Sequence, residues 1–159
     1  YMKCGLLVKA QDVFDMLPSR DVNSWNALIA GYAKFKHGVE ALRCFEHMQL
    51  EGVMPDSGTF VGVLVACCHG GLVEKGQTYL EIMTEDYGIS PTTEHHICMV
   101  SLLARAGHLD MALKMAAKMQ SYSPPLIWDA MLTGCEKWGN MEVGRFAFEN
   151  ESKWIDKST

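Results

Sequence analysis

Apolar residues recur at helical spacing along almost the whole chain. Residues 22–35 carry one such stripe and residues 38–51 carry another, as amphipathic helices do. The stripe positions are Trp25, Leu28, Ile29 and Tyr32 in the first segment, and Val39, Leu42, Phe45 and Met48 in the second. Glycine and proline separate the segments, as at Gly52 and Pro55, where they favour helix ends and turns. The pattern predicts pairs of short helices and no strands.

The helical pattern repeats along the chain in two registers. In the first register a small residue recurs with steps of 31, 35, 36 and 32 positions. These small residues are Ala10, Ala41, Gly76, Ala112 and Gly144. In the second register Trp25, Phe60, His96 and Trp128 follow one another with steps of 35, 36 and 32. Because two registers share the same unequal steps, they indicate a true structural repeat.

Short helix pairs cannot bury their apolar stripes alone, so they are expected to stack and share one core. The sequence therefore predicts an all-α fold, a right-handed α-solenoid of stacked antiparallel helix pairs that forms a TPR-like superhelix. We expect nine helices, the first an orphan whose partner would precede Tyr1. The small residues should lie where helices approach closely, and His96 should pack between helices because it shares the register of Trp25 and Phe60.

Composition and motifs exclude several classes of protein. The longest apolar run, residues 60–68, is about half the ~18 residues that a membrane span needs, so we expect no membrane contact. Six cysteines occur without a CxxC spacing, which favours buried, reduced thiols. His95 and His96 are adjacent and would point about 100° apart on a helix, so they do not predict a metal site. With no P-loop, GxGxxG or G-x-S-x-G motif, we expect no catalytic residue, metal or cofactor.

The repeats resemble the pentatricopeptide-repeat family, in the plant subclass that alternates standard, long and short motifs (PLS). The resemblance is carried by YMKCGLLVKAQDVFDMLPSRDVNSWNALIAGYAKFKHGVEALRCFEHMQLEGVMPD and by GTFVGVLVACCHGGLVEKGQTYLEIMTEDYGISPTTEHHICMVSLLARAGHLDMALKMAAKM. IWDAMLTGCEKWGNMEVGR is similar to the extension (E) motif that follows such arrays. The implied segments are a partial short repeat at 1–21, a standard repeat at 22–56, a long repeat at 57–92, a short repeat at 93–124 and an extension-like motif at 125–159.

The resemblance implies sequence-selective binding of single-stranded RNA in plant mitochondria or chloroplasts, as part of an RNA-processing or C-to-U editing specificity factor. In this family each repeat contacts one base through the fifth residue of its first helix and the last residue of the repeat. Here these residues are Asn26 and Asp56, a pyrimidine-preferring pair with uracil first. Asn23 and Gly58 stand where the family usually has valine to sandwich the base, and Asp21 ends the preceding repeat.

Two observations favour alternatives to base reading. Asn26 could be an ordinary early-helix residue, and Asp56 could be a helix N-cap or a turn residue. Val61 with Thr92, and Ile97 with Pro124, occupy the reading positions of the later repeats, and neither pair can hydrogen-bond a base through both members.

The charge and the missing deaminase motifs bear on partners. The net charge is −5, and residues 57–159 carry eight basic against twelve acidic side chains, which favours a protein-interaction scaffold for that half. The chain lacks the HxE and PCxxC segments of a zinc deaminase, so editing would need a deaminase or another editing factor in trans.

Overall fold

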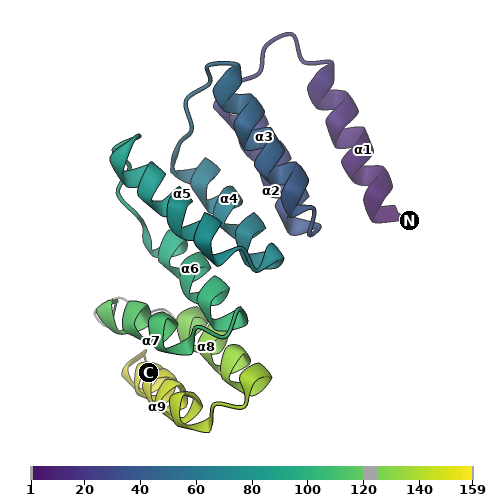
Figure 1. Cartoon of the computed structure of the whole chain (residues 1–159). Coiled ribbons are helices and arrows are strands. Elements are labelled where there is room, and N and C mark those ends of the chain that lie inside the picture. The colour runs from purple at the N-terminus through teal and green to yellow at the C-terminus, as the bar shows by residue number, and fades with distance from the viewer. Residues whose placement is uncertain (1, 120–124, 159) are drawn as a thin grey trace. The chain divides into compact units, whose positions relative to one another are not determined.

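The computed structural model describes residues 2–119 and 125–158, with side chains over 5–119 and 125–153. These ranges contain nine helices and no strand (Figure 1). The helices are α1 (Met2–Asp15), α2 (Val22–Lys34), α3 (Gly38–Leu50), α4 (Ser57–Gly70), α5 (Val73–Glu85), α6 (Thr93–Arg105), α7 (Leu109–Lys118), α8 (Pro125–Trp138) and α9 (Met141–Ser158). They form two compact units, residues 1–91 and 92–159.

The first unit stacks helix pairs side by side. Helix α2 pairs with α3 and α4 pairs with α5, while α2 and α4 pack directly against each other. Helix α1 contacts α2 (Figure 1). The stacked arrangement confirms the predicted all-α fold of paired helices, and it places the beginnings of α2 and α4 next to each other.

The second unit repeats the same packing. Helix α6 pairs with α7 and α8 pairs with α9, while α6 and α8 pack against each other. Its core includes the fully buried Trp128 and Met131 of α8 and Leu102 and Leu103 of α6. The same kind of helix pair is therefore found in both units.

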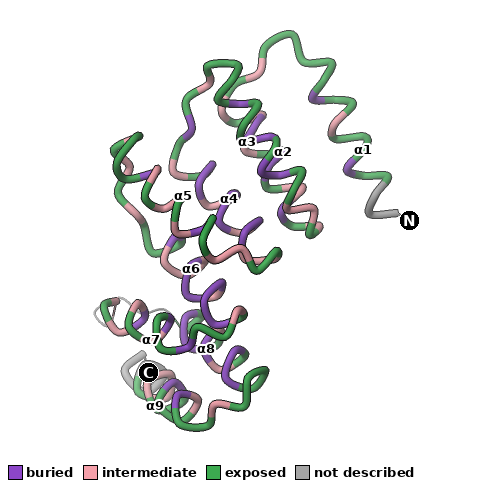
Figure 2. The backbone as a smooth tube through the Cα atoms, in the orientation of Figure 1, coloured by how far each residue is buried: buried purple, intermediate pink, exposed green. Residues whose placement is uncertain are grey.

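Aromatic residues of the predicted stripes fill the core of the first unit. The rings of Phe14 and Trp25 meet edge to face with their centroids 4.6 Å apart. The Phe45 ring lies between Phe60 and Tyr79, at centroid distances of 5.6 and 5.5 Å. Such contacts stabilise beyond the area that they bury. In Figure 2 the buried stretches accordingly follow α2 and α4.

Small residues lie at close helix contacts, with one exception. Ala41, Gly76 and Ala112 are buried, and a Cβ built at Gly144 would lie 3.3 Å from Cys135 Cβ. The prediction was wrong for Ala10, which is exposed on α1. Within the described residues α1 packs only on α2, so its other face stays uncovered.

Two further expectations about buried positions were wrong. Val39 is 62% exposed, whereas Leu42, Phe45 and Met48 are buried. Steps of three residues drift by about 60° on an α-helix, so Val39 has turned about 180° away from Met48. The buried face of α3 therefore includes Leu42, Phe45 and Met48 but not Val39.

His95 is completely buried, and His96, which was expected to pack between helices, is only partly covered. The His95 ring is drawn inward by the start of α6. Its Nδ1 accepts the Thr92 N–H at 3.0 Å and lies 2.8 Å from the Thr92 hydroxyl. The ring thus takes part in capping the helix, and the buried histidine is one position earlier than predicted.

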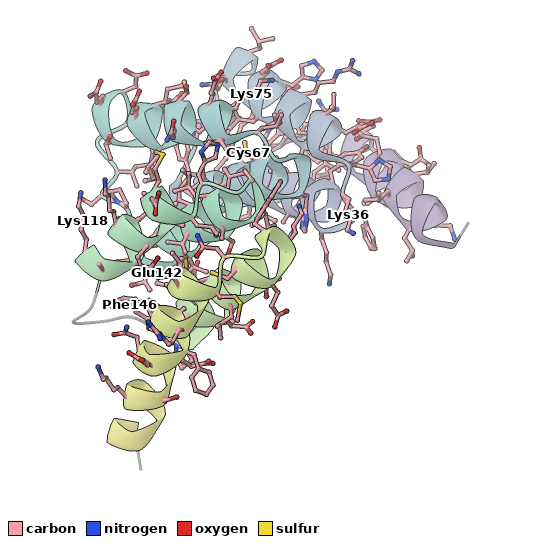
Figure 3. The ribbon with its side chains drawn as sticks, turned by 60° about the horizontal axis from the view of Figure 1, so that its bottom comes forward. Lys36, Cys67, Lys75, Lys118, Glu142 and Phe146 are labelled. Atoms are coloured by element: carbon pink, nitrogen blue, oxygen red, sulfur yellow. The ribbon has the colours of Figure 1, made fainter. Side chains whose placement is uncertain are left out.

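Left-handed backbone marks the turn inside each helix pair. Gly71, Gly107 and Gly139 have φ values of 65°, 88° and 67° there, as glycine allows. At the corresponding turn between α2 and α3 stands Lys36, with φ 64° (Figure 3). A lysine therefore holds a conformation that favours glycine.

Three of the five cysteines with described side chains are buried, namely Cys44, Cys67 and Cys135, and none of the five forms a disulfide. Burial raises the pKa of the Cys44 and Cys67 thiols to about 11. Figure 3 shows Cys67 in the first unit. Across the described part of the chain, no helix has the length and apolar character needed to span a bilayer.

Candidate nucleic-acid interface

The site begins with the cap of α4. Asp56 has extended backbone with φ −115° and ψ −176°, and its Oδ1 accepts the Thr59 N–H at 2.9 Å. In return, Thr59 Oγ1 accepts the Asp56 N–H at 3.0 Å. This reciprocal capping box satisfies two backbone donors that the first turn of a helix leaves open. The interpretation of Asp56 as an N-cap is therefore confirmed, and the cap fixes its carboxylate in place.

Packing of α2 against α4 brings Asn26 onto this cap. Asn26, the fifth residue of α2, donates from Nδ2 to Asp56 Oδ1 at 2.9 Å. Its Oδ1 accepts from the Thr59 hydroxyl at 2.5 Å. The two residues singled out by the repeat are thus joined across 30 positions of sequence, and Thr59 completes the contact. A side chain can cap a helix and still belong to a binding pair.

The Asp56 carboxylate is stabilised in its charged form. Burial alone would raise its pKa, but hydrogen bonds from the Thr59 N–H, the Asn26 amide and the Thr59 hydroxyl outweigh burial, so the pKa is lowered. A charged carboxylate only accepts hydrogen bonds, so the Asn26 end that faces it must be the amide nitrogen. The charge of Asp56 therefore sets the orientation of the amide.

The network is buried at one end and open at the other. Thr59 is completely buried, Asn26 is half-buried and Asp56 is exposed. After its contacts with Asp56 and Thr59, the Asn26 amide retains one N–H and one oxygen lone pair. These groups form a donor and acceptor side by side, the pattern that a base edge requires.

Gly58 leaves the Asn26–Asp56 pair uncovered. A Cβ at Gly58 would lie 3.3 Å from Asp56 Oδ1 and 3.4 Å from Asn26 Nδ2. Gly58 and Asn23 are both exposed. Of the predicted residues, Gly58 thus borders the pair directly, and Asn23 lies on α2 two positions after Asp21.

Asp21 repeats the cap at the start of α2. Its Oδ1 accepts the Ser24 N–H at 2.8 Å and the Ser24 hydroxyl at 2.6 Å. The Ser24 side chain, and then its backbone N–H, lower the pKa of Asp21. The structure therefore separates Asp21 from the Asn26–Asp56 pair and places it in an equivalent cap.

The corresponding positions of the later repeats carry other residues. Val61 occupies the position of Asn26, and Thr92 with His95 forms the cap of α6. Pro124 lies outside the described residues, and Ile97 is half-buried. The α4 cap thus contains a carboxylate that holds an amide, whereas the α6 cap is formed by a threonine and a histidine.

Thr59 is the residue that sequence reasoning missed. Its signal was present, because a hydroxyl three positions after an aspartate and beside an apolar run is a capping-box pattern. No group of three or more histidine, cysteine, aspartate or glutamate side chains among the described residues is arranged to hold a metal ion.

Helix pairs that stack on one another, with polar residues where neighbouring first helices begin, define a helical-repeat protein. Residues 20–69 match the PPR repeat family and residues 96–123 match the PPR repeat. The chain therefore contains pentatricopeptide repeats.

Similar proteins of Arabidopsis thaliana extend this finding over most of the chain. A mitochondrial pentatricopeptide repeat-containing protein is 45% identical over 94% of the chain and 20% of its own length. The chloroplastic protein CRR2 is 45% identical over 92% of the chain and 22% of its own length. The chain thus spans about a fifth of the length of these relatives.

Solved structures show the same fold. PPR10, crystallised with an 18-nt psaJ RNA element, matches 90% of this chain and 21% of its own with a TM-score of 0.76 and 14% identity. The PPR domain of Arabidopsis thaliana PRORP1, in complex with tRNA, matches 96% of this chain and 84% of its own with a TM-score of 0.72 and 16% identity.

Proposed function

We propose that this chain binds single-stranded RNA and reads one pyrimidine, uracil before cytosine, at Asn26 and Asp56. The observation that carries the proposal is the hydrogen bond of 2.9 Å between Asn26 Nδ2 and Asp56 Oδ1. It gives a half-exposed amide a fixed orientation at the start of α2. The remaining N–H of that amide suits uracil O4, and the remaining lone pair suits uracil N3–H.

Neighbouring residues support a base at this place. Asn23 precedes Asn26 in the sequence, and Gly58 follows Asp56. Both residues are exposed, and both stand at positions that face a base in the repeats that this chain resembles. Neither offers the apolar surface of a valine, so stacking contributes little and hydrogen bonds carry most of the contact. Asp21 supplies the corresponding carboxylate of the preceding repeat.

The comparisons support RNA as the partner. PPR10 and the PPR domain of PRORP1 were both crystallised with RNA. Relatives named mitochondrial or chloroplastic support a location in one of these organelles. We assign RNA binding in one of these organelles to this chain because its repeats are similar to those of these proteins.

The helix boundaries support a division of the chain into repeats. Helices α2, α4, α6 and α8 begin at Val22, Ser57, Thr93 and Pro125, which supports repeat boundaries at 22–56, 57–92, 93–124 and 125–159. A partial repeat occupies 1–21. We assign the chain to the PLS subclass with an extension-like end, in a specificity factor for C-to-U editing that works with a deaminase in trans.

RNA titration tests the proposal. The wild-type chain is expected to bind single-stranded oligouridylate more tightly than oligocytidylate, and both more tightly than a duplex RNA. Asn26→Ala removes the reading amide and should abolish the difference between the two oligonucleotides. Val61→Ala is the matched control, because that side chain cannot hydrogen-bond a base, and it should leave the difference intact. Equal binding of every RNA by the wild type would refute the proposed function.

A second function is favoured by one observation in the second unit. Phe146 and Phe148 of α9 are 40% and 60% exposed, and Glu142 lies one turn before Phe146 (Figure 3). Aromatic residues are enriched at protein–protein interfaces relative to the rest of a protein surface. Residues 92–159 would then act as a scaffold that recruits an editing enzyme. Loss of enzyme recruitment by Phe148→Ser, with RNA binding unchanged, is the expected result.

A further inference from the structure

Thr59 links the helix cap to the amide that faces the base. Its completely buried hydroxyl accepts the Asp56 N–H at 3.0 Å. It lies 2.5 Å from Asn26 Oδ1 and 3.0 Å from Asp56 Oδ1. A hydroxyl has a single hydrogen, and the nearer oxygen takes it. Asp56 therefore holds the nitrogen end of the Asn26 amide while Thr59 holds its oxygen end.

We propose that Thr59 is a positioning residue that makes this site distinguish uracil from cytosine. The hydroxyl acts through Asn26 and has no contact with RNA of its own. The inference rests on the proposed RNA-binding function and adds a specificity determinant to it.

The reason lies in the reversed edges of the two pyrimidines. Uracil presents an N3–H donor next to the O4 acceptor, whereas cytosine presents the N3 acceptor next to an amino donor. If the side-chain amide of asparagine can turn by half a rotation, its oxygen and nitrogen exchange places and it can hydrogen-bond either base. An asparagine whose two ends are fixed fits only one of them.

Both neighbours of Asn26 oppose the turned amide. Turning would bring Asn26 Oδ1 against the Asp56 carboxylate, where two acceptors repel each other. It would also place the amide N–H groups against the Thr59 hydroxyl, which would exchange its short bond to Asn26 Oδ1 for the longer one to Asp56 Oδ1 while still receiving the Asp56 N–H. Asp56 alone resists this turn through one contact, and Thr59 doubles the number of contacts that must break.

The experiment compares Thr59→Val, which replaces the hydroxyl by a methyl group, with Thr59→Ser, which keeps it. Oligouridylate and oligocytidylate are titrated into the labelled 159-residue chain, and NMR follows the Asn26 side-chain amide, so that weak binding is also measured. Thr59→Val is expected to lower the uracil-to-cytosine affinity ratio about two- to tenfold, the factor that one ordinary hydrogen bond carries. Thr59→Ser is expected to keep the wild-type ratio.

Each outcome separates the inference from the function on which it rests. A Thr59→Val ratio equal to that of the wild type, or an equal loss of affinity for both oligonucleotides, would overturn the role of Thr59 and leave RNA binding intact. Wild-type spectra in which neither RNA shifts the Asn26 amide would overturn the proposed function itself. Thermal unfolding checks each variant, and Thr59→Ala replaces Thr59→Val if the latter does not fold.

Discussion

Gly134 of α8 lies directly against Ala104 of α6: a Cβ at Gly134 would come within 2.8 Å of both the Cβ and the carbonyl oxygen of Ala104. The neighbouring atoms include backbone, which cannot move aside as the end of a flexible side chain can. Gly134 is also buried, so the two first helices of the second unit meet at this glycine. The contact shows why stacked helix pairs require small residues at particular positions.

Gly134→Ala is expected to destabilise the second unit by about 1–3 kcal/mol, the usual cost of overpacking a buried contact. The better helix propensity of alanine offsets only part of this cost. Denaturant unfolding measures the change. Gly5→Ala in α1 is the control, because a Cβ there meets nothing within 4 Å and should leave stability equal or slightly higher. Equal effects of the two substitutions would contradict the role of the Gly134 contact.

Lys36→Gly is expected to stabilise the first unit by about 0.5–1 kcal/mol. Lys36 has φ 64°, and the left-handed conformation costs a residue with a Cβ roughly 1–2 kcal/mol, part of which the greater freedom of glycine in the unfolded chain cancels. Thermal unfolding detects the gain as a higher Tm. The opposite kind of substitution, Gly71→Ala, adds a Cβ at a position with φ 65° where the Cβ meets nothing within 4 Å. It should lower stability because the left-handed backbone disfavours a residue with a Cβ. A Tm that falls with Lys36→Gly would argue against strain at this turn.

Acid should weaken the α4 cap through Asp56. Its pKa is lowered below the ordinary value of 3.8, so its charge contributes stability that is fully present above pH 3.8 and is lost as pH falls through the lower folded pKa. Asp56→Asn keeps a side chain that caps helices well and removes only the charge. The stability difference between wild type and Asp56→Asn should therefore shrink below pH 3.8. Chemical denaturation at a series of pH values measures it, and a constant difference would be the contrary result.

Cys44 and Cys67 should react slowly with thiol reagents in the folded protein. Their pKa values of about 11 leave little of the reactive thiolate near neutral pH, and both side chains are buried. Mass spectrometry after brief alkylation at pH 8 should find both unmodified, and alkylation in denaturant should modify both. Rapid modification without denaturant would mean that the first unit opens often.

The helix pairs could be predicted from sequence because apolar spacing and small residues record how helices pack. The proximity of Asn26 and Asp56 could also be predicted, since stacked repeats place the beginning of one first helix beside the beginning of the next. The contribution of Thr59 could not, because its local role in a capping box concealed its contact with a residue 33 positions earlier. The strained turn at Lys36 was missed for a simpler reason. The glycine that signals such a turn elsewhere in the chain is absent there.

Asn26→Thr tests whether the Asn26–Asp56 pair selects the base. Threonine cannot offer the paired donor and acceptor of the amide, so the contact with uracil should weaken by ~1–3 kcal/mol at that nucleotide. The family resemblance implies a preference for guanine when threonine is combined with Asp56. Binding to RNAs randomised at one nucleotide measures the change, with an array of repeats that contains residues 22–61.

Substitution of Ile97 by alanine provides the comparison for Asn26→Thr, because Ile97 holds the same repeat position and has no hydrogen-bonding group. It should leave the base preference at its own nucleotide unchanged. An unaltered uracil preference after Asn26→Thr would mean that the hydrogen bond between Asn26 and Asp56 serves only to join α2 to the cap of α4. A shift toward guanine would instead assign the choice of base to residue 26, with Asp56 and Thr59 acting as its supports.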